Sequence, residues 1–224
     1  MAAKVKWICL GLFLLIASSI HAQKSEVGNW FLYLGNQKIN DRWNLHSELQ
    51  YRNFNFAGDL EQLIIRTGLG YNLSENNNNV LLGYAYIHSE PYIFGTTDKR
   101  QTKEHRVFQQ FITKQSFGRV NVQHRYRFEQ RFLQDDFKMR FRYLLMLNIP
   151  INKKTMEKTA VYASLSNEIF INTEQNHYDR DRVYGGIGYC FNKNFKMEVG
   201  LMSQLLSTNS RAQFQIMIFN NLPF

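Results

Sequence analysis

The sequence has few cysteines, few prolines and no hydrophobic run of membrane-helix length. It contains 2 Cys and 3 Pro among 224 residues, and its mean hydropathy is −0.39. A bundle of membrane helices is excluded, because each helix needs about 20 consecutive apolar residues. Disorder is excluded as well, because 15% of the residues are aromatic. The chain is therefore a folded protein of formal charge +9, and its length suits a single domain.

Residues 1–22 predict a secretory signal peptide. Two lysines precede an apolar run, Trp7–Ile16, and the segment ends in a small residue, Ala22. The run is too short to span about 30 Å of hydrocarbon. Removing the two lysines lowers the formal charge from +9 to +7 and leaves residues 23–224 as one domain. Cys190 would then be the only cysteine, so no intrachain disulfide could form.

Alternation of polar and apolar residues runs through most of the chain and predicts an all-β protein. In residues 119–132 every second residue from Arg119 to Arg131 is polar, and most intervening residues are aromatic or aliphatic. A period of two residues is typical of a strand with two different faces, whereas a helix would distribute these arginines around its circumference. The segments with this pattern are 27–35, 42–52, 60–72, 80–90, 103–115, 119–132, 137–149, 159–171, 180–191, 195–205 and 211–222.

Arginine and lysine are distributed differently between strands and turns. Arg106, Arg127 and Arg142 lie inside predicted strands, whereas lysines such as Lys99 and Lys193 lie in turns. A closed interior favours arginine, because guanidinium groups form planar, multiply bonded networks with carboxylates. Small residues are expected on the same inner face, where they leave room for large side chains that cross a narrow barrel. These residues are Gly68, Gly70, Gly186, Gly188 and Gly200.

The alternation fits two architectures that differ in the face that contacts water. A soluble β-protein has its apolar face inside, whereas an outer-membrane barrel has its apolar face toward lipid. The arginine distribution favours the second, and so does the last segment, because an amphipathic strand followed by Phe224 resembles the signal read by the barrel-assembly machinery. We therefore expect a closed antiparallel transmembrane β-barrel of 10–12 strands in a Gram-negative outer membrane. A soluble periplasmic β-protein is the alternative.

The number of segments raises a problem of parity. Eleven are recognised, but bacterial single-chain barrels have even strand numbers, so we expect ten or twelve strands. With the C-terminus in the periplasm, the short turns at 115–118 and 192–194 lie there too, and the connection 90–103 lies outside. The segment 27–35 would then begin outside, which the few residues before it could not reach.

Several motifs occur in the order found in an uncharacterised bacterial family. Residues 104–110 read E-H-R-V-F-Q-Q, residues 125–131 read R-Y-R-F-E-Q-R, and residues 167–170 read N-E-I-F, followed by Gly188 and Tyr189. This order resembles the family called domain of unknown function 2490 (DUF2490) over nearly the whole mature chain. The resemblance implies an outer-membrane β-barrel of Gram-negative bacteria and implies no known substrate.

The polar faces of the strands form the strongest candidate site, an interior network of arginine and glutamate. Its predicted members are Glu104, Arg106, Arg125, Arg127, Glu129, Arg131, Arg140, Arg142, Glu168 and Arg182. Seven arginines face three glutamates in this set, so further acids such as Glu48 and Glu198, water or a small anionic solute must compensate the charge. The network either fills the lumen as a structural element or lines a narrow anion-selective pore.

Other chemistry has weak support in the sequence. No histidine pair has metal-ligand spacing on one strand face, so no metal and no cofactor is expected. A hydrolase or lipid-modifying enzyme is an alternative, with Asp135 and Asp136 in one loop and His177 and Asp179 in another. We assign no catalytic residue and expect no enzyme activity. Nucleic acid is not expected as a partner, because the arginines alternate with other residues inside strands instead of forming an exposed patch.

Overall fold

The fold is seen in a computed structural model, in which residues 27–74, 77–174 and 177–221 are described. The predicted signal peptide, residues 1–22, and the terminal Phe224 lie outside these ranges. Every regular element in the described part of the chain is a strand. The same part contains no helix with the length and apolar character needed to cross a membrane.

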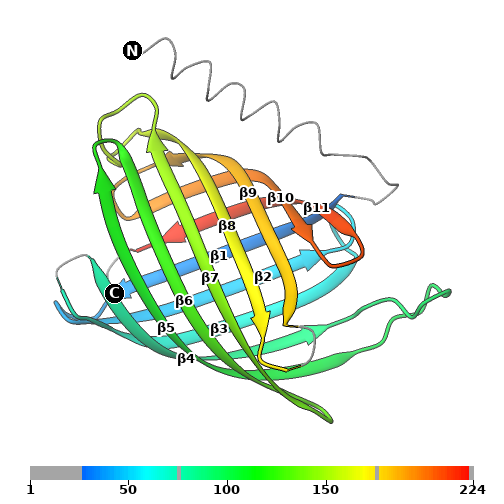
Figure 1. Ribbon diagram of the computed structural model, residues 1–224. Helices are drawn as coiled ribbons and strands as arrows, with labels where there is room; N and C mark the ends of the chain where they lie inside the picture. The colour runs from blue at the N-terminus through cyan, green and yellow to red at the C-terminus, as the bar shows by residue number, and fades with distance from the viewer. Residues whose placement is uncertain (1–26, 75–76, 175–176, 222–224) are drawn as a thin grey trace.

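Eleven strands follow one another around a closed barrel (Figure 1). Each strand coincides with one segment predicted from the alternation, and the boundaries differ by a few residues at most. The strands are β1 (Gly28–Lys38), β2 (Trp43–Asn53), β3 (Leu60–Asn72), β4 (Asn78–Ser89), β5 (Thr102–Phe117), β6 (Val120–Leu133), β7 (Phe137–Pro150), β8 (Val161–Asn172), β9 (Tyr178–Cys190), β10 (Phe195–Leu205) and β11 (Ser210–Asn220). The prediction of an all-β closed barrel is confirmed.

The barrel closes through a parallel pair of strands, β1 and β11. Their register runs from Gly28 opposite Gln213 to Gly35 opposite Asn220, and the other neighbouring pairs are antiparallel. The expectation of ten or twelve strands was therefore wrong. In an up-and-down chain of odd number the first and last strands run in the same direction. A parallel ladder still pairs their backbone groups, although it is slightly less stable per residue than an antiparallel one.

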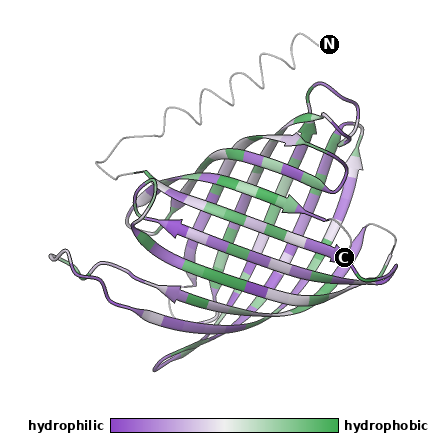
Figure 2. Ribbon diagram, turned by 180° about the vertical axis from the view of Figure 1, so that it is seen from behind, coloured by the Kyte–Doolittle hydropathy of each residue, from purple (hydrophilic) through white to green (hydrophobic). Residues whose placement is uncertain are grey.

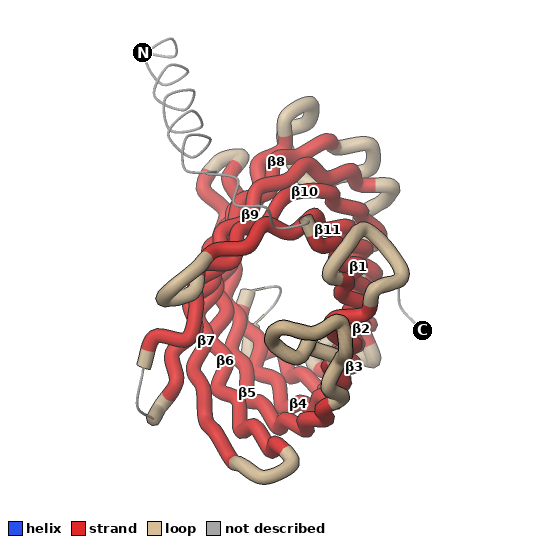
Figure 3. The backbone as a smooth tube through the Cα atoms, turned by 90° about the vertical axis from the view of Figure 1, so that its right-hand side faces the viewer, coloured by secondary structure: helices blue, strands red, loops and turns tan. Residues whose placement is uncertain are grey.

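The closed ring of strands has connections at both ends (Figure 3). We call the end at which β1 begins the N-terminal rim and the end at which β11 ends the C-terminal rim. The N-terminal rim carries the longest connection, residues 90–101, together with residues 54–59. The C-terminal rim carries residues 151–160 and the tight turn at 118–119, where Gly118 has a positive φ of 59°.

The connection 54–59 packs over the seam between β1 and β11. The backbone N–H of Asn29 donates to the carbonyl oxygen of Asn55 at 3.0 Å, and the Asn29 side-chain Nδ2 donates to the carbonyl oxygen of Phe56 at 2.9 Å. The Phe56 ring stacks on Phe214 of β11, with 6.5 Å between the ring centroids. One loop thus contacts both strands of the parallel pair.

The two faces of the strands differ in chemistry, as the alternation predicts. Hydrophobic and hydrophilic residues alternate along the strands (Figure 2). Large apolar side chains are exposed on the outer surface of the barrel, among them Phe31, Leu49, Ile65, Leu82, Phe141, Leu165, Ile187 and Leu201. Charged and amide side chains on the alternate positions are buried, among them Glu48, Arg66, Arg106, Gln110, Arg127, Glu129, Arg140 and Glu168. The interior thus combines this polar set with clusters of buried apolar side chains, such as the one that contains Ile64, Leu81 and Phe108.

Glycines on the inner face leave room for aromatic rings that cross the lumen. Gly83 pairs with Phe108 on β5, and Gly188 pairs with Tyr162 on β8. A Cβ atom on either glycine would overlap the ring opposite it. Both rings are almost fully buried. Gly188, which the sequence placed on the inner face, and Gly83, which it did not single out, thus have a packing function, since a larger residue would expel the ring from the lumen.

Candidate functional site

Glu129 lies at the centre of the inner face and is surrounded by arginines. Its carboxylate accepts hydrogen bonds from Arg140 at 2.7 and 3.2 Å and from Arg142 at 2.6 Å. Arg106 and Arg127 lie further away, with nitrogen-to-oxygen distances of 3.7 and 3.8 Å. Glu129 is 0% exposed. The carboxylate therefore links residues from β5, β6 and β7 in a site that water does not reach.

Two further carboxylates extend the network in opposite directions. Glu168 of β8 accepts from Arg142 at 2.7 and 3.0 Å and from Arg125 at 2.7 Å. Glu104 of β5 accepts from Arg106 at 2.7 and 2.8 Å and from Arg131 at 2.6 and 3.2 Å. These are short charge-assisted hydrogen bonds. Each glutamate thus bridges two arginines.

The acids that balance the remaining arginines are only in part those suggested by the sequence. Glu48, one of the two acids predicted to compensate the charge, forms an ion pair with Arg66. Asp179, which was not predicted for this role, accepts a hydrogen bond from Arg140 at 2.7 Å. Glu198, the other predicted acid, instead accepts hydrogen bonds from the hydroxyls of Tyr162 at 2.9 Å and Tyr184 at 3.4 Å. Its position on β10, toward the C-terminal rim, places it beyond the arginines.

Nine of the ten predicted network residues share ion pairs in the structure, and the tenth, Arg182, does not. Its Nε and Nη2 donate to the side-chain oxygen of Gln204 at 3.0 and 2.8 Å. Its guanidinium group also lies over the Phe170 ring at 4.6 Å and over the Trp30 ring at 5.0 Å. Arg182 is therefore held by neutral groups instead of a carboxylate.

Arg52 of β2 has the same kind of environment and was absent from the predicted network. Its Nε donates to Gln50 at 3.0 Å and its Nη1 to Gln62 at 2.9 Å. Its guanidinium carbon lies 3.8 Å from the centroid of the Trp30 ring. Arg52 and Arg182, neither of which forms an ion pair with a described carboxylate, thus contact the same tryptophan. The alternation places Arg52 on the polar face of β2, but no local signal in the sequence brings it to Trp30.

Histidine and amide side chains interrupt the apolar outer face. His105 bonds the hydroxyl of Tyr84, and His124 bonds that of Tyr143 at 2.8 Å. Gln109 and Gln130 bond each other across β5 and β6, at 3.1 Å in one direction and 3.4 Å in the other. Each polar group thus has a partner on the same surface, which lowers the cost of placing it among apolar residues.

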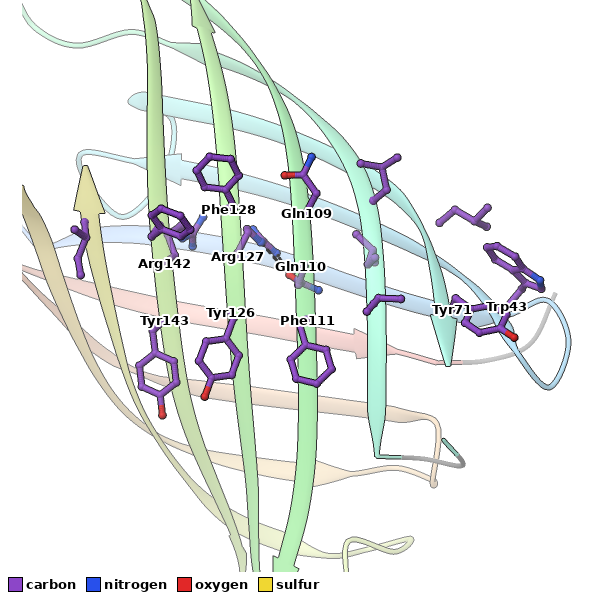
Figure 4. A pocket seen from close by; sticks show the side chains of 16 residues that line it. Trp43, Tyr71, Gln109, Gln110, Phe111, Tyr126, Arg127, Phe128, Arg142 and Tyr143 are labelled. Carbon is purple, nitrogen blue, oxygen red and sulfur yellow. Dashed lines mark hydrogen bonds between the residues drawn. The ribbon is translucent and has the colours of Figure 1, made fainter. Parts of the chain in front are cut away.

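A shallow groove of about 650 Å³ crosses this part of the outer face and is lined mainly by apolar side chains. Phe111, Tyr126 and Tyr143 lie side by side on β5, β6 and β7, whereas Arg127 and Gln110 lie on the opposite face of the same strands (Figure 4). The groove is open and carries no cluster of titratable groups, so we regard it as part of the apolar exterior.

The residues considered for catalysis have other partners. Asp136 pairs with Lys138 at 2.9 Å, and Asp179 pairs with Arg140 and Arg180. His177 Nδ1 lies 3.3 Å from the backbone oxygen of Asn172. Among the described residues no group of three or more metal-ligating side chains is assembled. These contacts do not form a hydrolytic couple in the described part of the chain.

An ion pair joins two connections of the N-terminal rim. Lys99 pairs with Asp59, which also accepts a hydrogen bond from the hydroxyl of Tyr92 at 2.9 Å. Partial burial raises the pKa of Asp59, but the hydrogen bonds from Lys99 and Tyr92 outweigh it and hold this pKa below its ordinary value. The same partner raises the pKa of Lys99 above its ordinary value against its own desolvation. The pair therefore fastens the connection 90–101 to the connection 54–59.

Comparison with known proteins gives one match. A family model described as protein of unknown function (DUF2490) matches residues 27–215, which include ten complete strands and part of β11. No curated protein matches, and no solved structure matches.

Proposed function

The chain belongs to the DUF2490 family of proteins of unknown function, and on that premise we propose that it is an integral outer-membrane β-barrel of structural or transport type. In this proposal the signal peptide directs export from a Gram-negative cytoplasm, and the C-terminal strand is read by the barrel-assembly machinery. Lipid surrounds the outer face. The Arg/Glu network fills the lumen, and no catalytic role is assigned.

The exposed apolar exterior is the observation that carries the proposal. Side chains such as Leu82, Ile187 and Leu201 are 56–59% exposed although they lie within regular strands. A water-soluble barrel rarely exposes a contiguous apolar surface of this kind, because such a patch drives association. Aromatic residues near the strand ends, such as Trp43 and Tyr71, suit the boundary between hydrocarbon and water. Lipid is the environment that matches both features.

Two arginine substitutions at equally exposed positions test the membrane location. Leu201 lies in the middle of β10 and is 56% exposed, and Ile151 lies in a connection of the C-terminal rim and is also 56% exposed. In a membrane, Leu201→Arg costs about 2–4 kcal/mol of stability and Ile151→Arg costs much less, because only the first places a charge in hydrocarbon. Refolding into lipid vesicles, followed by the heat-dependent gel shift, measures the difference. Equal tolerance of both changes, with recovery of the protein in a detergent-free soluble fraction, would show a soluble barrel instead.

A narrow anion-selective pore is the second candidate, favoured by the excess of arginine in the lumen. Its pathway would follow Arg125, Arg127, Arg140 and Arg142. Arg127 and Arg142 are only 2% and 7% exposed, which supports the closed lumen. We therefore expect no steady conductance from the folded protein in a planar bilayer. An anion-selective conductance that decreases in Arg127→Ala would show that the lumen is an open pore and that the proposal of a closed barrel is wrong.

A further inference from the structure

We propose that the lumen contains a binding site for a phosphate group, formed by Arg52, Arg182 and Trp30 beside the Arg/Glu network. The inference deepens the proposed transport-type function of the barrel. It rests on the arrangement of the inner face and is independent of whether lipid surrounds the outer one.

The first support is geometric. The guanidinium carbons of Arg52 and Arg182 lie 3.8 and 5.0 Å from the centroid of the Trp30 ring, although the two residues belong to β2 and β9. The closure of the barrel through β1 and β11 brings these strands together around Trp30. Two fixed guanidinium groups beside one ring can address the oxygens of a single oxyanion.

The second support is the balance of charge. Arg125, Arg131 and Arg142 each contact a carboxylate. Arg52 and Arg182 are bonded to glutamine oxygens, and no ion pair with a described carboxylate involves either of them. Glutamine satisfies the N–H donors but supplies no charge. Glu168 is the cross-strand neighbour of Arg182, but its carboxylate is already shared by Arg125 and Arg142. Arg52 and Arg182 therefore have no carboxylate of their own, which is costly for two positive charges in a low-dielectric interior.

The third support comes from polar atoms on the same inner face without partners. The indole Nε1 of Trp30 has no hydrogen-bond partner, although the residue is only 3% exposed. The side-chain nitrogen and oxygen of Gln213, which is 1% exposed, are unpartnered as well. Gln213 lies on β11 two residues before Gln215, which is opposite Trp30 in the parallel pair. Buried donors without partners are uncommon and indicate a missing acceptor.

The site is reachable from the N-terminal rim. Arg180, one inward position closer to that rim than Arg182, has a side chain that is 28% exposed. Arg182 itself is half-buried. A small solute therefore approaches Arg182 from this rim past the Arg180–Asp179 ion pair.

The chemistry of the donors selects the ligand. Guanidinium forks bind tetrahedral phosphate oxygens in pairs, and an indole N–H adds a single donor. A phosphate dianion balances both arginines, whereas a carboxylate or chloride balances one. The shared chemistry fits inorganic phosphate and the phosphate end of a small organic ester equally.

The test uses the mature protein folded in detergent, with Trp43→Phe as the background. The chain has 3 Trp, of which Trp7 lies in the predicted signal peptide, so Trp30 becomes the only reporter. Inorganic phosphate is titrated against its fluorescence, and isothermal calorimetry gives an independent affinity. We expect saturable binding that sulfate displaces. Arg52→Gln and Arg182→Gln should each weaken it about tenfold or more, because each removes charge-assisted hydrogen bonds.

Arg100→Gln provides the matched control, because Arg100 is exposed on the same rim and its loss changes the net charge equally. Its phosphate affinity should equal that of the parent protein. Titration with glycerol 3-phosphate distinguishes the sources: tighter binding than inorganic phosphate indicates an organic ester as the ligand. If a glutamine variant does not refold, the melting temperature of the wild-type protein provides the test. It should be higher in phosphate than in chloride at equal ionic strength, and equal melting temperatures would overturn the site.

A non-saturable response, or an equal response in Arg100→Gln and Arg182→Gln, would overturn the proposed site. It would show that phosphate acts only as a non-specific counter-ion of a basic protein. That result in a barrel that still shows the heat-dependent gel shift leaves the proposed function intact. Conversely, a soluble chain that binds phosphate as described overturns the membrane location and keeps the site.

Discussion

Replacing Glu129 with glutamine tests whether the lumen is held together by charge. The substitution keeps the shape of the side chain and one acceptor oxygen, but removes the full negative charge that contacts both Arg140 and Arg142. Arg106 and Arg127 lose a more distant counter-charge at the same time. Nothing replaces it from solvent, because Glu129 is 0% exposed.

The expected loss follows from the cost of leaving buried charge unpaired. Removing one partner of a buried ion pair typically costs about 3–5 kcal/mol. Arg142 keeps Glu168 and Arg140 keeps Asp179, so part of the charge remains balanced. We therefore expect Glu129→Gln to lower the free energy of unfolding by about 3 kcal/mol, at the lower end of that range.

Urea unfolding and refolding in lipid vesicles, followed by tryptophan fluorescence, measures this free energy. Glu157→Gln is the matched control, because Glu157 is exposed in the connection 151–160 and its carboxylate accepts a hydrogen bond only from the hydroxyl of Thr155 among the described residues. The control should change stability by less than about 0.5 kcal/mol. A loss of the same small size in Glu129→Gln would refute the view that the network stabilises the barrel, and would indicate that water or ions already screen these arginines.

Two further predictions concern the packing of the lumen and the N-terminal rim. Gly83→Val should destabilise the barrel by about 1–3 kcal/mol in the same assay, because its side chain would overlap the Phe108 ring. Gly185→Val should be neutral, because a Cβ atom there would lie 3.7 Å from the Leu165 side chain. Equal effects of the two substitutions would contradict the packing of Phe108 against Gly83. The pKa of Asp59 is lowered by its contact with Lys99. The contact therefore stabilises the rim fully at pH values above the ordinary carboxyl pKa near 3.9, and this stabilisation is lost as pH falls through the lower pKa of the folded state. The pKa of Lys99 is raised. Its stabilising contribution is therefore fully present at pH values below the ordinary lysine pKa near 10.4, and is lost only as pH rises through the higher pKa of the folded state. Amides in residues 54–59 and 90–101 should therefore be protected from hydrogen exchange at neutral pH in the wild type and lose this protection in acid. In Asp59→Asn the protection should already be absent at neutral pH. Equal protection in the variant and the wild type would show that the Asp59–Lys99 contact does not hold the two connections together.

The alternation predicted the strands because it follows from a local rule. Successive side chains point to opposite faces, so the polar positions from Arg125 to Arg131 had to share one surface. The tendency of carboxylates and guanidinium groups to pair then predicted that Glu129 would have arginine neighbours. Neither rule requires knowledge of the register between strands.

Features that depend on closure were beyond the sequence. Glu198 lies on an inner face, as the pattern predicts, but the stagger of β10 places it beside Tyr162 and away from the arginines. Arg52 and Arg182 meet at Trp30 only because β1 pairs with β11, and the even-number rule argued against that pairing. A rule drawn from other barrels thus misled the count that the chain's own periodicity had given correctly.

The parallel seam also separates the two ends of the described chain. β1 starts at one rim and β11 finishes at the other, so a linker that joined them would have to run the full height of the wall. An 11-residue strand at roughly 3.3 Å per residue sets the upper limit of that height, because the strands are tilted to the barrel axis. Circular permutants with short linkers should therefore fail to close, unlike those of barrels whose ends meet at one rim. Affinity tags placed at the two ends would stand on opposite sides of any layer that surrounds the barrel.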